Sequence, residues 1–177
     1  MSTLRLFVCL YPPRDVAESL LSALAGQSLP EHRQVAAEQV HLTLHFIGEI
    51  DSRQLDEVRE SVERSASGLE CFSLAITSLI SLPERGETRL VAARCASHST
   101  LEELHRRLVH RLARKKQGRE DFLPHMTLVR LRVPTRMERV ELPLDRVEFP
   151  VRAIHLVQSH LQTGGAVHRT VAEFGLR

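Results

Sequence analysis

Several residue types are scarce in this chain of 177 residues, and each shortage excludes a class of protein. Aromatic residues make up only 4% of the sequence, with no tryptophan and one tyrosine, so aliphatic side chains must form the hydrophobic core. No segment approaches the ~18 uninterrupted apolar residues of a membrane-spanning helix. The N-terminal segment also lacks the long apolar region of a secretory signal peptide. We therefore expect a globular protein of the cytoplasm.

Cysteine is also scarce, and its placement excludes a disulfide framework. Cys9, Cys71 and Cys95 are odd in number and far apart, and none of them belongs to a C-x-x-C pair. Each lies in apolar surroundings, so we expect three buried free thiols in a reducing compartment.

Net charge is small, but it is unevenly distributed. The 24 basic residues nearly balance the 22 acidic ones, leaving +2. The segment from His105 to Arg119, however, carries seven positive charges and no acid: Arg106, Arg107, Arg111, Arg114, Lys115, Lys116 and Arg119. This segment is either a patch that binds an anionic ligand or a solvated helix face, and the sequence leaves both interpretations open.

Hydrophobic periodicity predicts a mixed chain of strands and helices in a single domain spanning residues 1–177. The predicted strands cover 4–10, 40–47, 72–79, 89–95, 125–131, 151–159 and 167–174. Helices are predicted over 15–25, after a cap at Asp51, and over 99–112 after a capping box that starts at Ser99. Gly164 and Gly165 indicate a hairpin between the last two strands.

The strand–helix–strand order occurs twice, with an offset of 84 residues. At that offset His41-Leu42-Thr43-Leu44 aligns with His125-Met126-Thr127-Leu128. Recurrence at matching places in two similar strings of elements predicts an internal duplication, with two lobes related by a pseudo-two-fold axis.

Each of these H-x-T segments places a histidine and a threonine on one face of a strand, because side chains alternate along a strand. His41 and Thr43 should face His125 and Thr127 across a cleft, with leucine and methionine behind them. Two opposed imidazoles suit a phosphodiester, since one can accept a proton while the other donates one near neutral pH. A single H-x-T would more simply be a structural histidine, but two with the same neighbours favour a site.

Metal binding is the competing use of histidine, and the spacing argues against it. His41 and His45 would be about 13 Å apart in a strand at ~3.3 Å per residue, too far to share one ion. The remaining histidines also lack ligand spacing, so we expect no metal. Which of Ser159, His160 and His168 line the cleft stays open.

The segments RLFVCLYPP, VHLTLHFIGEI, PHMTLVR and IHLVQSHLQTGGAVH together resemble the 2H phosphoesterase superfamily. Within it the chain is most similar to the bacterial and archaeal RNA 2′,3′-cyclic phosphodiesterases, also called 2′-5′ RNA ligases. The resemblance runs from Arg5 to Phe174. The chain departs from the family pattern at 34–37, where an aromatic residue is usual, and at His168, where tyrosine is common.

The resemblance implies a bilobal α+β fold, with two antiparallel sheets facing a central cleft and helices outside. It implies that His125 activates water and that His41 protonates the departing 3′ oxygen. Thr43 and Thr127 would hold the phosphoryl oxygens. Two further predicted substrate contacts are Arg130 and Phe7. Strict alternation would point Arg130 away from His125, however, and core packing is the simpler interpretation of Phe46.

The predicted function is hydrolysis of RNA 2′,3′-cyclic phosphate ends to 2′-phosphates by a monomer that needs no cofactor, with tRNA fragments among the candidate substrates. Reversible 2′-5′ joining of RNA is also implied. ATP use has no visible site, because the chain lacks a GxxxxGK[ST] loop. Two alternatives are an RNA-binding module that grips a phosphate without turnover and a phosphodiesterase for a small cyclic nucleotide phosphate.

Overall fold

The computed structural model describes residues 2–112 and 122–177. Four of the seven basic residues singled out above therefore lie outside the described residues: Arg114, Lys115, Lys116 and Arg119. The described elements are β1 (Thr3–Leu10), α1 (Arg14–Ala23), β2 (His32–Gln34), η1 (Ala37–Gln39), β3 (Leu42–Asp51), η2 (Ser52–Gln54), α2 (Leu55–Ala66), β4 (Phe72–Leu82), β5 (Thr88–Cys95), α3 (Ser99–Leu112), β6 (His125–Thr135), β7 (Glu141–Val151), β8 (Ala153–Gln162) and β9 (Gly165–Gly175).

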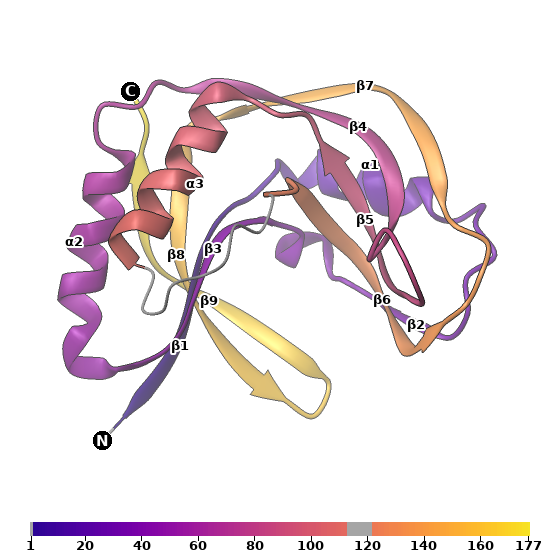
Figure 1. The fold of residues 1–177 in the computed structure, drawn as a ribbon, viewed down its shortest axis with the longest axis horizontal. Helices are drawn as coiled ribbons and strands as arrows, with labels where there is room; N and C mark the ends of the chain where they lie inside the picture. Colours follow the sequence, from indigo (N-terminus) through magenta and orange to yellow (C-terminus); the bar gives the residue numbers. More distant parts are fainter. Residues whose placement is uncertain (1, 113–121) are drawn as a thin grey trace.

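The strands form one antiparallel sheet in the order β7-β4-β5-β6-β3-β1-β8-β9, with β2 added beside β6 (Figure 1). Among the described strands, its two halves are joined only where β3 meets β6, at the residue pair Leu42 and Met126. The α+β class and the antiparallel pairing are confirmed, but the two expected sheets are continuous through this narrow junction. The predicted duplication stays a prediction.

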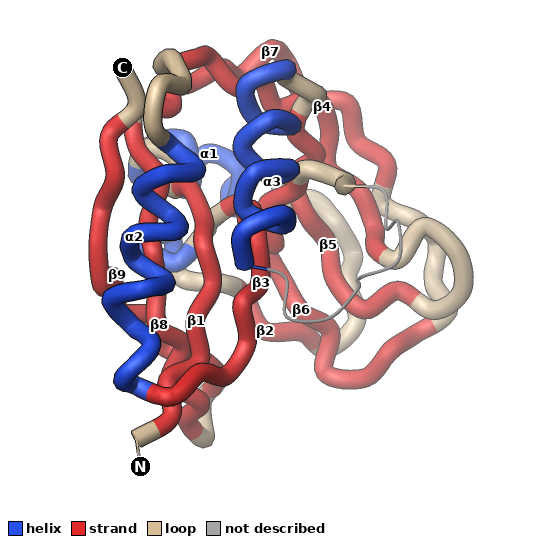
Figure 2. Tube along the Cα trace, turned by 60° about the vertical axis from the view of Figure 1, so that its left-hand side comes forward, coloured by secondary structure: helices blue, strands red, loops and turns tan. Residues whose placement is uncertain are grey.

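Helices α2 and α3 pack on the half of the sheet that contains β3. Helix α3 lies against both α2 and β3, and α1 lies apart from them at the other end of the molecule (Figures 1 and 2). The predicted apolar stripe of α3 is fully buried, at Leu101, Leu104 and Leu108. Asp51 forms the predicted capping box with Gln54 at the start of η2, which leads into α2. At α3 the cap is one residue earlier than predicted, because the His98 imidazole accepts from the Thr100 amide.

Two of the three described arginines of the basic segment are engaged within the protein. Arg106 and Arg107 both pair with Glu103, at 2.7 and 2.8 Å, and Arg107 also donates to the Ser67 carbonyl at 2.9 Å. Glu103 lies just before the acid-free stretch, so counting charges between His105 and Arg119 missed it. These two arginines therefore fit the interpretation as a helix face better than the interpretation as a patch that binds an anionic ligand.

Two strands were missed by the sequence analysis for physical reasons. Strand β7 contains Pro143 and Pro150, which argue against a central strand, but β7 is an edge strand, where a missing N–H is tolerated. Strand β2 has only three exposed residues and therefore no periodic pattern. One thiol prediction was also wrong, because Cys71 is exposed whereas Cys9 and Cys95 are buried. Burial raises the pKa of both buried thiols to about 12.

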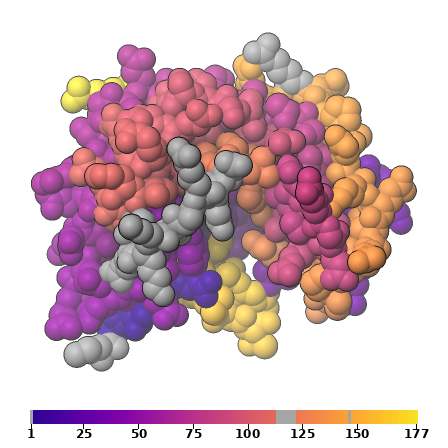
Figure 3. Space-filling view, in the orientation of Figure 1, coloured from indigo at the N-terminus to yellow at the C-terminus, as the bar shows by residue number. Residues whose placement is uncertain are grey.

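No helix in the described ranges is long and apolar enough to cross a membrane. In the space-filling view the β8–β9 hairpin, in yellow, projects below the junction between the two halves of the molecule (Figure 3). This hairpin forms one wall of the pocket described below.

The buried stripe of α3 predicts a specific loss of stability. Replacing Leu104 by alanine leaves a cavity in the core, so Leu104→Ala should lower the free energy of unfolding by about 2–5 kcal/mol in urea denaturation. Leu161→Ala is the matched control, because Leu161 is 72% exposed and its loss should change stability by less than about 0.5 kcal/mol. Equal effects would show that the stripe does not hold α3 on the sheet.

Candidate active site

The two H-x-T segments meet at the junction of the two half-sheets. His41 directly precedes β3, and His125 is the first residue of β6. Leu42 and Met126 pair in antiparallel register, so continuing the register places His41 opposite Thr127 and Thr43 opposite His125. Each histidine thus lies beside the threonine of the other segment, and the sheet itself brings the predicted residues together.

A β-bulge follows each threonine at the same place in the repeat. In β3 the register skips Leu44, and in β6 it skips Leu128. Such an extra residue reverses the alternation of faces beyond it. This reversal brings Arg130 to the face of Thr127, which strict alternation did not predict, and Arg130 lines the pocket there.

The same reversal corrects the interpretation of Phe46 as a core residue. Phe46 is 47% exposed, and the Arg5 guanidinium lies 5.2 Å from its ring centroid. Its buried neighbour is His45, which is 5% exposed. Phe46 therefore occupies the position in β3 that Arg130 occupies in β6.

Both histidines are anchored by the same hydrogen bond. The Nδ1 atom of His41 lies 2.7 Å from the Gln39 carbonyl, and Nδ1 of His125 lies 2.8 Å from the Leu123 carbonyl. A carbonyl oxygen can only accept, so both rings carry the proton on Nδ1. Nε2 of each ring is thereby left to exchange a proton with a ligand.

Aromatic rings surround His41. The ring of Phe7 lies 5.1 Å from that of His41, and Tyr11 lies 6.0 Å away. His168 is 5.1 Å from His41 in a T-shaped arrangement and 4.9 Å from Phe7. Phe7 is only 3% exposed, because it packs against these rings and against Cys9 and Val157. The surrounding rings restrict the orientation of the His41 imidazole.

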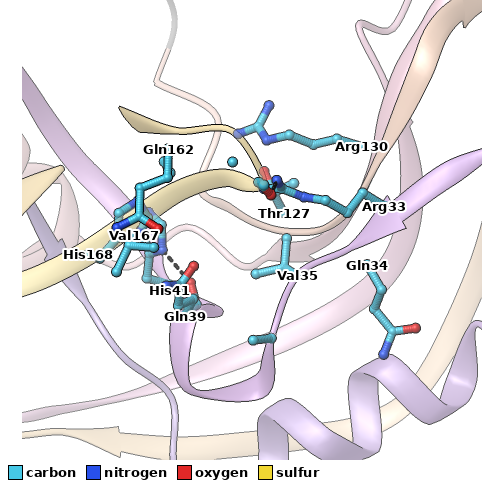
Figure 4. Close-up of a pocket in the computed structure, with 14 residues that line it drawn as sticks. Arg33, Gln34, Val35, Gln39, His41, Thr127, Arg130, Gln162, Val167 and His168 are labelled. Atoms are coloured by element: carbon cyan, nitrogen blue, oxygen red, sulfur yellow. Dashed lines mark hydrogen bonds between the residues drawn. The ribbon is translucent and has the colours of Figure 1, made fainter. Parts of the chain in front are cut away.

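A pocket of about 370 Å³ opens beside His41 (Figure 4). Three of the six predicted site residues line it, namely His41, Thr127 and Arg130, whereas Thr43, His125 and Phe7 do not. No acidic side chain of the described residues lines it. The complete lining is Arg33, Gln34, Val35, Ala36, Gln39, His41, Thr127, Arg130, Gln162, Gly164, Gly165, Ala166, Val167 and His168.

The β8–β9 hairpin forms one wall of the pocket, and its position shows which of Ser159, His160 and His168 line the pocket. His168 does so, whereas Ser159 and His160 line a separate hollow beside Arg5. An Arg33 N–H donates to the Gly164 carbonyl and so connects β2 to the hairpin. Gly165 has a φ of +118°, a backbone conformation that favours glycine, and a Cβ there would displace the end of the Arg33 side chain.

Sequence reasoning missed Arg33 because nothing in residues 32–34 indicates a strand. Only the pairing of β2 with β6 brings Arg33 opposite Arg130. His168 was noted as a departure from the family pattern, but its contact with His41 depends on how β9 folds back along the sheet.

The electrostatics of the pocket favour an anion. Burial lowers the pKa of His41 to about 4, and the charges of His168, Arg130 and His125 act in the same direction, opposed by the Gln39 hydrogen bond. Burial and the Arg130 charge lower the pKa of His168, and burial and the Arg33 charge lower that of Arg130. Positive groups thus destabilise one another here, and a bound anion would relieve the repulsion. Among the described residues no cluster of His, Cys, Asp and Glu could hold a metal ion.

The pKa of His41 predicts that stability depends on pH in the mildly acidic range. Between its ordinary pKa of 6.5 and the folded value of about 4, the unfolded chain binds more protons at His41 than the folded one. The free energy of unfolding should therefore fall as pH is lowered from 6.5 towards 4. Urea denaturation at pH 7 and pH 5 should show a smaller loss for His41→Asn than for wild type. His160→Asn, outside the pocket, should retain the full loss, and an equal loss in all three proteins would contradict the assignment.

Comparison with known proteins places this geometry in a family. The model of the 2′-5′ RNA ligase superfamily matches residues 12–163. The RNA 2′,3′-cyclic phosphodiesterase of Thermus thermophilus is 29% identical over 182 residues, which cover 98% of this chain and 91% of that protein. The Methanocaldococcus jannaschii RNA 2′,3′-cyclic phosphodiesterase is 21% identical and covers 97% of this chain and 100% of that protein.

Solved structures share the fold. The crystal structure of Escherichia coli LigT complexed with 3′-AMP superposes with a TM-score of 0.85 over 99% of both chains, at 23% identity. A crystal structure from Thermus thermophilus gives 0.81 over 98% of both chains, at 27% identity. With a family model that spans most of its length and a fold that agrees, the chain belongs to the 2′-5′ RNA ligase superfamily.

Proposed function

We propose that this protein hydrolyses 2′,3′-cyclic phosphates at RNA ends to 2′-phosphates, without a metal ion or another cofactor. The observation that carries the proposal is the junction of β3 and β6, which joins two histidines with identical Nδ1 anchors and two threonines. The relatives named as RNA 2′,3′-cyclic phosphodiesterases support the choice of substrate.

The proposed reaction divides the proton transfers between the two histidines. Nε2 of His125 takes a proton from water as the water oxygen attacks phosphorus. The bond from phosphorus to the 3′ oxygen breaks, and Nε2 of His41 protonates that oxygen. The products are a 2′-phosphate and a free 3′-hydroxyl, and proton exchange with solvent restores both imidazoles.

The lowered pKa of His41 bears on this division, because a general acid must carry a proton. In the empty pocket burial keeps His41 neutral at pH 7. A phosphodiester anion beside it favours the charged ring and raises its pKa, as an opposite charge does. Substrate binding and protonation of His41 are therefore coupled.

The threonines stabilise the negative charge that develops on the non-bridging phosphoryl oxygens. Hydroxyl groups of Thr43 and Thr127 donate to the non-bridging oxygens, and Arg130 supplies a positive charge near His41. Phe7 fits a positioning role beneath His41 better than the predicted direct contact, since only 3% of it is exposed.

The wider proposal is a cytoplasmic monomer, a single duplicated domain over residues 1–177, acting on RNA ends such as those of tRNA fragments. Attack on the cyclic phosphate by an RNA 5′-hydroxyl in place of water, with His125 taking the hydroxyl proton and His41 protonating the departing 3′ oxygen, would join the two ends through a 2′-5′ bond. No nucleotide is consumed in that step, because the strained cyclic ester provides the leaving 3′ oxygen.

Turnover in the presence of a chelator tests the reaction class. RNA ending in a 2′,3′-cyclic phosphate is incubated with the protein in EDTA, and the products are separated by chromatography against 2′- and 3′-phosphate standards. We expect the 2′-phosphate at an undiminished rate, because histidines perform both proton transfers. Activity that a metal ion restores after EDTA treatment would refute the mechanism. Binding without turnover would favour the RNA-binding alternative.

The histidine assignments predict matched losses. His41→Ala and His125→Ala should each lower kcat by about 10²–10⁴, the usual contribution of one proton-transfer group. The double variant should fall by much less than the product of the two losses, because the histidines act as a unit. His160→Ala, in an exposed position outside the pocket, is the control and should retain wild-type kcat. A single variant with wild-type kcat would remove that histidine from the mechanism.

A further inference from the structure

Two arginines on neighbouring strands share the pocket wall beside the H-x-T residues. Arg33 of β2 and Arg130 of β6 are direct register partners, and both line the pocket (Figure 4). Like charges placed directly opposite each other in a sheet are unfavourable. The arrangement therefore costs stability in the empty protein, and an anionic ligand would compensate for that cost.

An arginine close to this pair does have an acidic partner, in contrast to Arg33 and Arg130. Arg132, two residues beyond Arg130, pairs with Glu31 at 2.9 Å. Within the described ranges no salt bridge reaches Arg33 or Arg130, and the Arg33 guanidinium instead donates to the Gly164 carbonyl. That contact uses one N–H, so other donors of Arg33 remain for a ligand.

The two arginines extend outward from the reacting residues. The charge of Arg130 acts on both His41 and His168, whereas the charge of Arg33 acts on Arg130. Because Leu128 is bulged out, Arg130 lies two extended steps from Thr127, about 7 Å along the strand. Arg33 follows at the ~4.8 Å spacing between strands. The distance from Thr127 to this pair of arginines is thus similar to the distance between successive phosphates of a nucleic acid strand.

We propose that Arg33 and Arg130 form a subsite for a second phosphate, the one at the 5′ position of the nucleotide whose cyclic phosphate is opened. The inference rests on the proposed function and narrows its substrate to a terminal nucleotide that carries a 5′ phosphate, as the 3′-terminal nucleotide of an RNA chain does. Two guanidinium groups match the oxygens of a phosphodiester through paired N–H donors. A nucleoside 2′,3′-cyclic phosphate leaves this subsite empty.

Binding of the reaction products tests the subsite without requiring turnover. Calorimetry compares adenosine 2′-phosphate with adenosine 2′,5′-bisphosphate on the whole protein. The bisphosphate should bind to wild type at least about tenfold more tightly, the scale of a charge-assisted contact. Arg33→Gln should remove most of that advantage, and Arg33→Lys, which keeps the charge without the planar fork, should retain part of it. Arg132→Gln, with its side chain paired to Glu31, is the matched control and should behave as wild type.

Turnover then separates this inference from the proposed function. The ratio of kcat/KM for a dinucleotide ending in a cyclic phosphate to that for a nucleoside 2′,3′-cyclic phosphate should fall about tenfold in Arg33→Gln and stay unchanged in Arg132→Gln. Equal affinity of wild type for the two products, or an unchanged ratio in Arg33→Gln, overturns the subsite even if hydrolysis occurs. Absence of turnover together with Arg33-dependent preference for the bisphosphate overturns the proposed reaction and retains the subsite.

Discussion

The pairing of Leu42 with Met126 is the contact on which the candidate site depends. It is the sole residue pair that joins the two half-sheets through β3 and β6 in the described structure. Because the strands are antiparallel at this point, each histidine faces the threonine of the other segment. A slip of one residue in this register would put the histidine and threonine of one strand on the opposite face of the sheet from those of the other. The arrangement of the two histidines and two threonines thus depends on two apolar, fully buried residues.

Equivalent β-bulges on the two sides of this junction expose side chains of different chemistry. The bulges at Leu44 and Leu128 occur at the same place in the repeat and turn Phe46 and Arg130 to the same face. One side of the site therefore continues as an aromatic surface and the other as a cationic one. The two sides of the junction are therefore not equivalent, although the backbone is bulged in the same way on both.

The predictions from sequence succeeded where local pattern and burial agree. The stripe of α3 is buried as predicted, because a helix has to hide such a face. The two H-x-T segments lie close together as expected, although through direct pairing of β3 with β6 and not across a cleft between separate sheets. Predictions were wrong where the position in the sheet overrides local pattern, as for β7 with its two prolines at an edge and for Phe46 beyond a bulge.

By itself the sequence determined the residue types, the repeat of 84 residues and the resemblance to a family, because these are properties of the order of residues alone. Tertiary structure decided which of these residues meet. Arg33 opposes Arg130 through a three-residue strand without a sequence signal, and His168 reaches His41 because the β8–β9 hairpin folds beside β1. The physical reason is that strand pairing is a long-range choice: register, bulges and edges depend on partners far away in the chain, and local sequence does not encode them.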